Sequence, residues 1–376
     1  MGFPIPNLQG FTYYKLCLSL CLIIGIHFQS YGQITLEKQA EELTHYLDTW
    51  YNKETGLWET TSWWNAANIL TALTNNARLT NDPTFKFTIA DVFHKTKEFE
   101  VAATDEKSAW VCKDYINDFY DDEGWWALAW LDAWEFTGEQ KYLDMANIIF
   151  DDITTGWSDQ GGLYWKKGLD FRGSISNGLT MTLATRLHLA GTETVNGKSA
   201  LLWATTIWDW MIDSQLLDAN GNIQDGIRFE NGQESIKENI YTYNQGVVLT
   251  GLVNLYKITG NVHYLESAHS LVKATLENLT NNGLVLVEKI CEPDQCNPDA
   301  KQFKGIFMRH LMYLNDHSPR ETYKAFILKN VKALWEKAME NGTKAPGVVW
   351  DKPSEANAAT VSSALDAFNA ALSLQE

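Results

Sequence analysis

A helix-turn-helix pattern that recurs along the chain is the feature that most restricts its fold. The segment WEFTGEQKYLDMA at 134–146 is echoed by YKITGNVHYLESA at 256–268, and a degraded copy, RLTNDPTF, stands at 78–85. In both full copies a helix ends at Thr-Gly and the next helix opens near Tyr-Leu, as expected for an α-hairpin. Hairpins that recur roughly every 60 residues predict about six of them in the chain.

Helical periodicity also dominates the segments between these copies. Apolar residues at positions i, i+3, i+4 and i+7 predict helices over 38–51, 124–137, 196–214, 243–259 and 320–340. Strand-like alternation is confined to short runs at 162–165 and 284–289, which we expect to form small hairpins in loops. We therefore predict an all-α fold, a closed toroid of inner and outer helices with the active cleft in the loops at one end. An open α-solenoid is the alternative, although its repeats would be shorter and more regular.

The first 32 residues have the pattern of an export signal. Lys15 precedes an apolar run over 16–28 that is too short to span a bilayer, and residues 30–32 resemble a small-residue cleavage site. We expect cleavage after Gly32 and export to the periplasm, the cell surface or the medium. No linker-like or low-complexity stretch divides residues 33–376, so we expect a single domain there, without a membrane span.

The cysteines fit an oxidising compartment. Cys291 and Cys296 stand in the short sequence CEPDQC and can close a local disulfide there. We interpret Cys112 as a buried free cysteine rather than a catalytic thiol, because no histidine nearby offers an activating base. Cys21 is a weak lipoprotein candidate because the bulky Leu20 precedes it.

Charge and aromatic content narrow the class of partner. Asp and Glu number 47 against 30 Lys and Arg, and the net charge of −17 would repel a nucleic acid but not a neutral glycan. The 16 Trp, 15 Tyr and 16 Phe exceed what a core requires, so we expect some rings to line a groove.

We expect neither a metal nor an organic cofactor. The eight histidines show no paired-ligand spacing. Asp218, Asn220, Asn222 and Asp225 imitate a calcium loop but lack its glycine in the required place.

Two adjacent aspartates, Asp121 and Asp122, open the tryptophan-rich segment YDDEGWWALAWLDAW. Acids at a helix start usually serve capping and compensation of the helix dipole. Here Asp118 and Glu123 bring the acids to four within six residues, more than capping needs. Crowded carboxyls beside apolar rings have raised pKa values, and cleavage of an acetal between sugars needs both a proton donor and a second carboxylate.

Four ordered blocks of sequence resemble glycoside hydrolase family 76. They are DFYDDEGWWALAWLDAWEFTGEQKYLDMA, GGLYWKKGLDFRGSISNGLTMTLATRL at 161–187, YTYNQGVVLTGLVNLYKITG at 241–260 and FKGIFMRHLMYL at 303–314. The resemblance runs from about residue 38 to the C-terminus. It implies an (α/α)6 barrel with the activity of a retaining endo-α-1,6-mannanase acting on fungal-type α-mannan or its oligosaccharides.

The resemblance also assigns roles to residues. Asp121 would be the nucleophile and Asp122 the general acid/base, which is chemically consistent because neighbouring side chains can reach the separation of roughly 5 Å used by retaining enzymes. The candidate substrate contacts are Asn65, Trp125, Trp126, Asn177, Asp225, Asn244, Gln245, Lys304 and Arg309.

Each substrate contact has a structural alternative. One of the two tryptophans is as readily a core residue, and each amide is as readily a turn or cap residue. Asp225 stands in an ordinary turn sequence. For Lys304 and Arg309, we favour an ion pair that stabilises the barrel over a contact with substrate.

Two other classes of protein on an α-toroid are alternatives to a monomeric mannanase. A glycan-binding protein without activity would be expected to lose one aspartate, and a sugar epimerase to use histidine pairs. A transglycosidase differs mainly in how its site excludes water, so sequence separates it poorly from a hydrolase.

Overall fold

The two copies of the repeat are helix-to-helix corners of the same geometry. The computed structural model describes residues 1–2, 34–101, 110–282, 284–293, 296–340 and 345–375. Gly138 and Gly260 end their helices at φ values of 74° and 71°, and their N–H groups donate to the carbonyls of Trp134 and Tyr256. Glycine adopts this left-handed conformation without strain, so each Thr-Gly ends one helix and turns the chain into the next.

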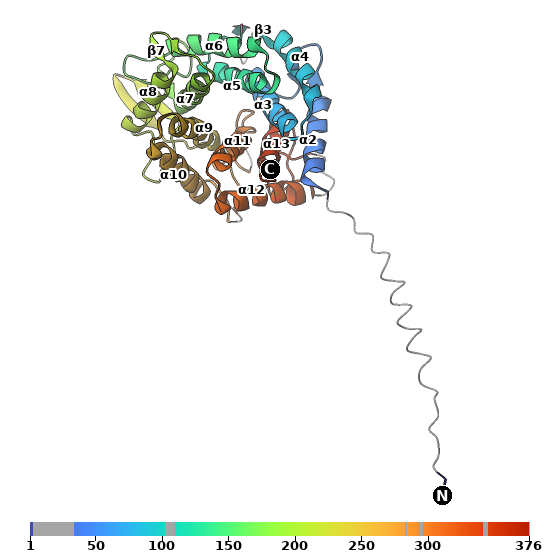
Figure 1. The fold of residues 1–376 in the computed structure, drawn as a ribbon. Helices are drawn as coiled ribbons and strands as arrows, with labels where there is room; N and C mark the ends of the chain where they lie inside the picture. The colour runs from blue at the N-terminus through green and yellow to red at the C-terminus, as the bar shows by residue number, and fades with distance from the viewer. Residues whose placement is uncertain (3–33, 102–109, 283, 294–295, 341–344, 376) are drawn as a thin grey trace. The chain divides into compact units, whose positions relative to one another are not determined.

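Twelve α-helices form two concentric rings in the described part of the chain from Leu36 onward (Figure 1). The inner helices are α3 (Trp63–Leu79), α5 (Tyr120–Thr137), α7 (Ser174–Leu189), α9 (Thr242–Thr259), α11 (Phe303–His317) and α13 (Ala358–Ser373). The outer helices are α2 (Leu36–Trp50), α4 (Lys86–Thr96), α6 (Gln140–Thr155), α8 (Ala200–Asp213), α10 (Val262–Asn278) and α12 (Glu321–Ala333). Each inner helix packs on the next and α13 packs on α3, which closes the ring. The predicted closed toroid is therefore confirmed.

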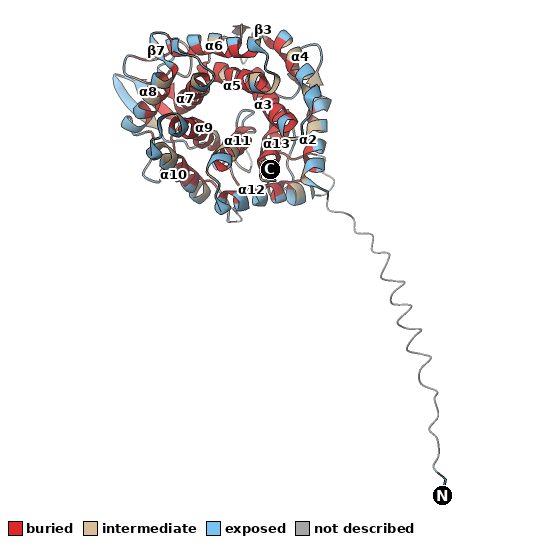
Figure 2. Ribbon diagram, viewed as in Figure 1, coloured by how far each residue is buried: buried red, intermediate tan, exposed pale blue. Residues whose placement is uncertain are grey.

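Burial separates the two rings. The inner helices are buried on nearly every side, whereas the outer helices are exposed on their outward faces (Figure 2). Glycines allow two of the closest inner contacts: a Cβ at Gly246 would lie 2.6 Å from the Cα of Phe307, and one at Gly305 would lie 2.4 Å from the Cα of Ser363. The inner helices thus have little solvent-facing surface except at their ends, where a site can form.

The predicted helices are present, with different boundaries. Helix α5 begins at Tyr120, four residues before the start predicted at 124, so the aspartate pair lies inside its first turn. Helix α8 begins only at Ala200, because 194–199 form the hairpin of β6 (Thr194–Val195) and β7 (Lys198–Ser199). Helix α12 ends at Ala333, and a π-helical turn, Leu334–Ala338, follows it.

Short strands lie in the loops between the helices, but at other positions than the sequence predicted. The segments 162–165 and 284–289 fold back in tight antiparallel turns with single bridges, Trp157 to Leu163 and Thr280 to Leu286. The side chains of Asn177 and Asn330 accept from the N–H groups of Leu163 and Leu286. A three-stranded sheet joins β5 (Phe171–Gly173), β8 (Gly226–Glu230) and β9 (Gln233–Lys237). Two further hairpins pair β1 (Tyr51–Asn52) with β2 (Leu57–Trp58) and β3 (Glu98–Val101) with β4 (Trp110–Lys113).

The predicted export signal lies outside the described residues, apart from residues 1–2. Leu36–Glu376 forms one compact unit by its internal contacts. Across the described residues, the helices all fall short of the length and apolar character required to cross a membrane.

Candidate active site

A cleft of about 680 Å³ opens at the N-terminal ends of the inner helices. The residues at or near the starts of these helices that line it are Trp64 on α3, Phe119, Asp121, Asp122 and Trp125 on α5, Ile175 on α7, Tyr241 and Tyr243 on α9, and Phe303 on α11. The rest of its wall comes from the connecting segments, with Trp165, Phe171, Asp225, Arg228, Lys237, Asn239, Asn297 and Asp299. Helix N-termini carry partial positive charge, so this end of the barrel suits anionic side chains.

Asp121 and Asp122 lie in the first turn of α5, and neither occupies its N-cap position. Phe119 holds the N-cap position and makes no side-chain cap bond. The indole N–H of Trp165 donates to Oδ2 of Asp121 at 2.9 Å, and the Nδ2 amide of Asn117 donates to Oδ2 of Asp122 at 2.9 Å. Each aspartate is therefore held by its own donor.

The pKa values of both aspartates are raised. Burial is the largest cause for Asp122 and lifts its pKa well above the ordinary range, the charge of Asp121 adds to this, and the amide of Asn117 opposes it. Burial also raises the pKa of Asp121, but the Trp165 donor and backbone amides at the helix start oppose the rise. Asp299 raises the pKa of both groups. This environment favours one shared proton, held on Asp122.

A continuous aromatic surface lies beside the pair. The rings of Trp64 and Trp125 stack at 5.9 Å, those of Trp125 and Tyr243 at 6.4 Å, and those of Tyr243 and Phe303 at 3.8 Å. These four rings come from α3, α5, α9 and α11, so closure of the barrel assembles a platform from distant parts of the sequence. Flat aromatic faces of this kind suit the apolar faces of sugar rings.

Polar groups from the loops face the platform. Asp225 precedes β8, and its backbone is fixed by bonds to Ser174 N and Lys237 O. Burial raises the pKa of Asp225 to about 6, with Arg228 and the amide of Asn244 opposing the rise. Asp299 accepts from the Trp64 indole at 3.1 Å. Carboxylates in this position can accept hydrogen bonds from sugar hydroxyls.

Three of the predicted amide contacts are structural. Asn65 bonds Ser62 and Gln302, Asn177 holds both backbone groups of Leu163, and Gln245 holds both backbone groups of Ile223. All three side chains are buried and outside the cleft lining. Asn244 is also buried, but it adjoins Asp225 behind the cleft wall. Asn65 therefore belongs to a capping box at the start of α3, whereas Asn177 and Gln245 lie within α7 and α9 and hold loop backbone.

Trp126, Lys304 and Arg309 also lie away from the cleft lining. Trp126 is fully buried and stacks on Trp130 at 5.4 Å, whereas Trp125 faces the cleft. Lys304 pairs with Glu292 at 2.6 Å, and Arg309 pairs with Asp366 at 2.7 Å. Both cations are therefore in ion pairs, the interpretation that the sequence favoured over a contact with substrate.

Several cleft residues were missed in the sequence. Trp64, Tyr243 and Phe303 stand at helix starts, and Trp165 and Asp299 lie in loops. The first three carried a detectable signal, since an aromatic residue in the first turn of an inner helix faces the same end of the barrel as the aspartates. Trp165 and Asp299 carried no such signal, because the direction of a loop side chain depends on the conformation of the loop.

The disulfide loop borders the cleft. Cys291 and Cys296 are bonded, and the chain then passes through Asn297 and Asp299 on the cleft wall before α11 begins. Cys112 is a free thiol, buried beneath the start of α5, and burial raises its pKa to about 12. A thiol with so high a pKa is a poor nucleophile.

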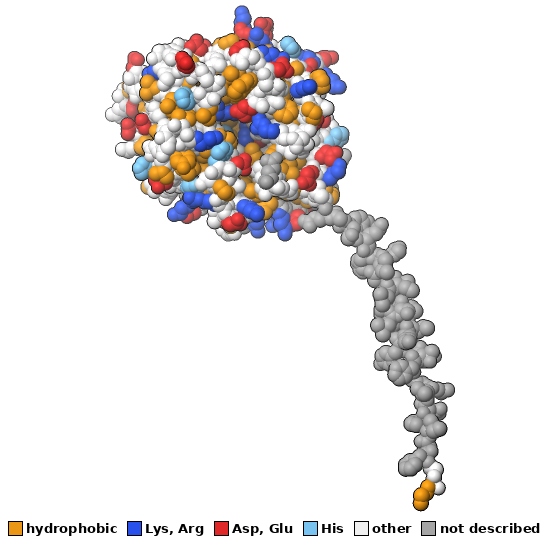
Figure 3. Space-filling model, viewed as in Figure 1, with side chains coloured by type: hydrophobic (Ala, Val, Ile, Leu, Met, Phe, Trp, Pro, Cys, Tyr) orange, Lys and Arg blue, Asp and Glu red, His pale blue; other side chains and the backbone are white. Residues whose placement is uncertain are grey.

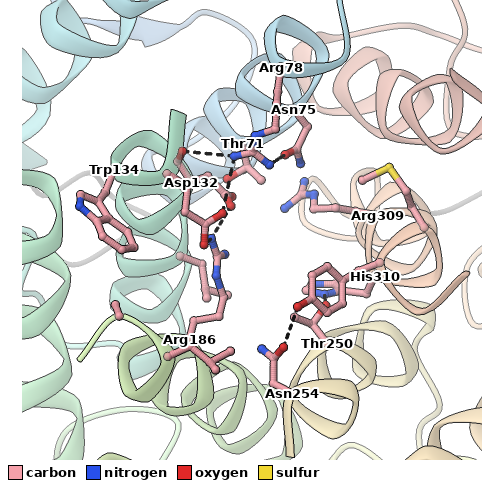
Figure 4. Close-up of a pocket in the computed structure, with 16 residues that line it drawn as sticks. Thr71, Asn75, Arg78, Asp132, Trp134, Arg186, Thr250, Asn254, Arg309 and His310 are labelled. Atoms are coloured by element: carbon pink, nitrogen blue, oxygen red, sulfur yellow. Dashed lines mark hydrogen bonds and ion pairs between the residues drawn. The ribbon is translucent and has the colours of Figure 1, made fainter. Parts of the chain in front are cut away.

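A second cavity, of about 270 Å³, lies at the opposite ends of the inner helices (Figure 4). Its two carboxylates are already paired, since Arg186 binds Asp132 at 2.7 Å and Glu135 at 2.8 Å. His310 bonds Thr250 at 2.7 Å, and burial lowers its pKa well below the ordinary range. This network links inner helices and has no pair of carboxyls available for acid/base chemistry, so it is a weaker candidate active site.

The described residues contain no group of three or more His, Cys, Asp or Glu side chains arranged to hold a metal. In the turn that imitates a calcium loop, the Asp218 carboxylate accepts from the backbone N–H groups of Asn220 and Asn222. On the face shown in Figure 3, Lys and Arg side chains are interspersed with Asp and Glu rather than forming a basic stripe.

The profile of glycosyl hydrolase family 76 matches residues 35–376. The chain belongs to this family. The sequence resemblance is therefore confirmed. A mannan endo-1,6-alpha-mannosidase of Candida albicans is 31% identical over 215 residues, which cover 51% of this chain and 46% of the relative. One of Candida glabrata is 28% identical over 57% of this chain and 50% of the relative. The chain thus spans about half the length of these curated relatives.

Solved structures of similar fold include an alpha-1,6-mannanase of Salegentibacter sp. HEL1_6. Its TM-score is 0.78 at 23% identity, covering 91% of this chain and 100% of that one. That structure is of an inactive variant with two consecutive aspartates replaced by asparagine, in complex with alpha-1,6-mannotriose. Dfg5 from Chaetomium thermophilum, in complex with glucosamine, has a TM-score of 0.77 at 18% identity and covers 92% of this chain and 93% of that one.

Proposed function

We propose that this chain is a retaining, endo-acting glycoside hydrolase that cleaves α-1,6-mannosidic bonds in the backbone of fungal-type α-mannan. The observation that carries the proposal is the Asp121–Asp122 pair, with raised pKa values, beside an aromatic platform in an open cleft. Membership of family 76 and the names of the Candida relatives support the substrate class. The inactive Salegentibacter variant, altered at two consecutive aspartates, supports the choice of catalytic pair.

In the first step Asp121 attacks the anomeric carbon while Asp122 donates its proton to the departing glycosidic oxygen. Asp121 suits attack because the Trp165 indole and the backbone amides at the start of α5 stabilise its ionised form. Asp122 suits proton donation because burial and the neighbouring charge favour its protonated form. The product is a mannosyl ester on Asp121 and a free hydroxyl on the leaving oligosaccharide.

In the second step Asp122 removes a proton from water as the water oxygen attacks the anomeric carbon, the bond to the Asp121 carboxylate breaks, and this second inversion restores the α configuration. Esterification removes the negative charge of Asp121, which lowers the pKa of Asp122 and makes it a base when a base is required. Trp125, Tyr243 and Phe303 would stack on mannose rings, and Asp225 would accept from their hydroxyls.

The test is incubation of the chain with debranched α-1,6-mannan, with products followed by NMR. We expect short oligosaccharides whose first-formed reducing end is the α anomer. A β anomer appearing first would mean inversion and would remove Asp121 from the role of nucleophile. Longer products on addition of an acceptor sugar would indicate a transglycosidase instead.

Substitution of the pair provides the matched test of mechanism. Asp121→Asn and Asp122→Asn should each lower turnover by roughly three orders of magnitude or more while leaving the circular dichroism spectrum unchanged. Asp144→Asn, at an exposed position on α6, is the control and should retain full activity. Near-normal turnover in either active-site variant would exclude that residue from the chemistry.

We further propose that residues 1–32 direct export and that 33–376 act as a monomeric catalytic domain. The composition of the signal and a disulfide at Cys291 and Cys296 support an oxidising destination. N-terminal sequencing of the exported protein tests the cleavage site after Gly32, and sedimentation tests the monomer.

A further inference from the structure

A chain of buried polar groups lies behind Asp122. Asn117, 5% exposed, uses three polar groups in three directions. Its Nδ2 donates to Oδ2 of Asp122 at 2.9 Å, its backbone N–H donates to Oε1 of Glu123 at 3.1 Å, and its Oδ1 accepts from the N–H of Phe119 at 2.7 Å. A flipped amide would place oxygen against the Asp122 carboxylate and NH2 against the Phe119 N–H. The amide orientation is therefore determined, and it aims a donor at Asp122.

Glu123 fixes Asn117 from behind. Its side chain is fully buried and faces away from the cleft, where Oε1 also accepts from Nζ of Lys167 at 3.1 Å. Lys167 is held in turn by Asp152 at 2.7 Å and by a backbone bond to the carbonyl of Asp118. Burial of the Glu123 carboxylate makes its ion pair with Lys167 costly to form. The pair holds the loop 117–119 against the start of α5.

The other charged groups near Asp122 are carboxylates, and they oppose its ionisation. Asp121 on the same helix and Asp299 from the loop before α11 both place negative charge near it. The thiol of Cys112 on β4 stays neutral because burial raises its pKa to about 12. Asn117 supplies the donor that opposes these charges.

We propose that Asn117, held in place by Glu123 and Lys167, is a positioning residue that allows Asp122 to ionise for the second step of the reaction. The inference rests on the proposed function. Without the Asn117 donor, the pKa of Asp122 would be higher. Asp122 would still donate its proton in the first step, but at neutral pH it would stay protonated and could not act as the base that activates water. The donor thus tunes the balance between the two roles of one carboxyl.

The decisive variant is Asn117→Asp, which keeps an acceptor for the Phe119 N–H and replaces the donor by an acid. We expect the alkaline limb of the pH profile of kcat/KM to move up by about one unit, a tenfold change in the ionisation constant. At neutral pH kcat should fall more than kcat/KM, with accumulation of the glycosyl-enzyme. A ¹³C carboxyl titration of Asp122 in the free protein should show the same upward shift. Glu123→Ala should shift both readouts in the same direction, and Glu123→Gln, which keeps the acceptor, should shift them less.

The control is Asn330→Asp on α12. Asn330 is a buried amide with the same division of roles, accepting from the Leu286 N–H and donating to the carbonyls of Leu284 and Phe326. Its substitution should lower thermal stability without moving the pH profile. If the wild-type chain cleaves mannan but Asn117→Asp leaves both the alkaline limb and the Asp122 titration unchanged, the inference is overturned. If the wild-type chain releases no oligosaccharide, the proposed function fails, and the carboxyl titration still decides the role of Asn117.

Discussion

The two adjacent aspartates differ in the donors they receive, and the roles that we propose for them depend on this difference. Asp121 accepts from an indole, and Asp122 accepts from an amide that is fixed by a buried glutamate. Their pairing was visible in the sequence because like charges beside aromatic residues are unusual. Their donors were not visible, because Trp165 lies 44 residues further along the chain and reaches Asp121 only through the folding of a loop.

Trp165→Phe is expected to weaken Asp121 as a nucleophile at low pH. The substitution keeps the ring and removes the N–H that stabilises the carboxylate, so the pKa of Asp121 should rise further. The acid limb of kcat/KM should move up by about one unit, and activity below that limb should fall about tenfold. Trp157→Phe, which changes an indole outside the cleft lining, is the control. An unchanged acid limb would show that the bond does not control ionisation.

Asp122→Asn is expected to stabilise the protein at alkaline pH. Because burial raises the folded pKa of Asp122 above its unfolded value of about 3.9, its contribution to stability is fully present below that value and is lost as pH rises through the folded pKa. Asparagine cannot ionise, yet its oxygen can still accept from Asn117. Thermal melts should therefore show a higher Tm than wild type at pH 8 and equal values at pH 4. A lower Tm at pH 8 would contradict the desolvation argument.

Among the secondary-structure elements, the predicted and observed positions differ mainly at helix starts and in loops. Hydrophobic periodicity located α9 within one residue but placed the start of α5 four residues late, because the first turn of α5 is polar where it faces the cleft. The three-stranded sheet was missed since β5 pairs with β8 across more than fifty residues, a contact that local alternation does not encode. The candidate site therefore lies where local sequence rules are weakest.

The disulfide loop gives a prediction at this scale. Cys291 and Cys296 close a loop of only five positions, so replacing both by serine should cost about 2 kcal/mol of unfolding free energy. The same change should raise KM, because the loop leads into Asn297 and Asp299 on the cleft wall. Mass mapping under non-reducing conditions should find the bond in the wild-type chain and a free thiol at Cys112. Finding both loop thiols free would refute the assignment.

The whole molecule depends on closure of the inner ring. The repeat and the periodicity predicted hairpins of inner and outer helices, but not which helix would close the circle. In the structure α13, the last helix, packs on α2, α3, α11 and α12, so the two ends of the folded unit are joined by packing. A cleft whose aromatic surface combines α3, α5, α9 and α11 exists only when that closure is complete.

Truncation before α13 should therefore abolish cooperative folding rather than merely weaken it. The helix is buried along nearly its whole length, and its Asp366 neutralises Arg309 while Ser363 accepts from the N–H of Gly305. Loss of one partner of a buried ion pair alone costs roughly 3–5 kcal/mol, a large share of the stability of an average domain. A chain ending at residue 357 should show reduced helical circular dichroism and no sharp thermal transition. A chain ending at residue 373 keeps the whole helix and should melt like wild type; cooperative melting of the shorter chain would mean that the remaining hairpins are stable without a closed ring.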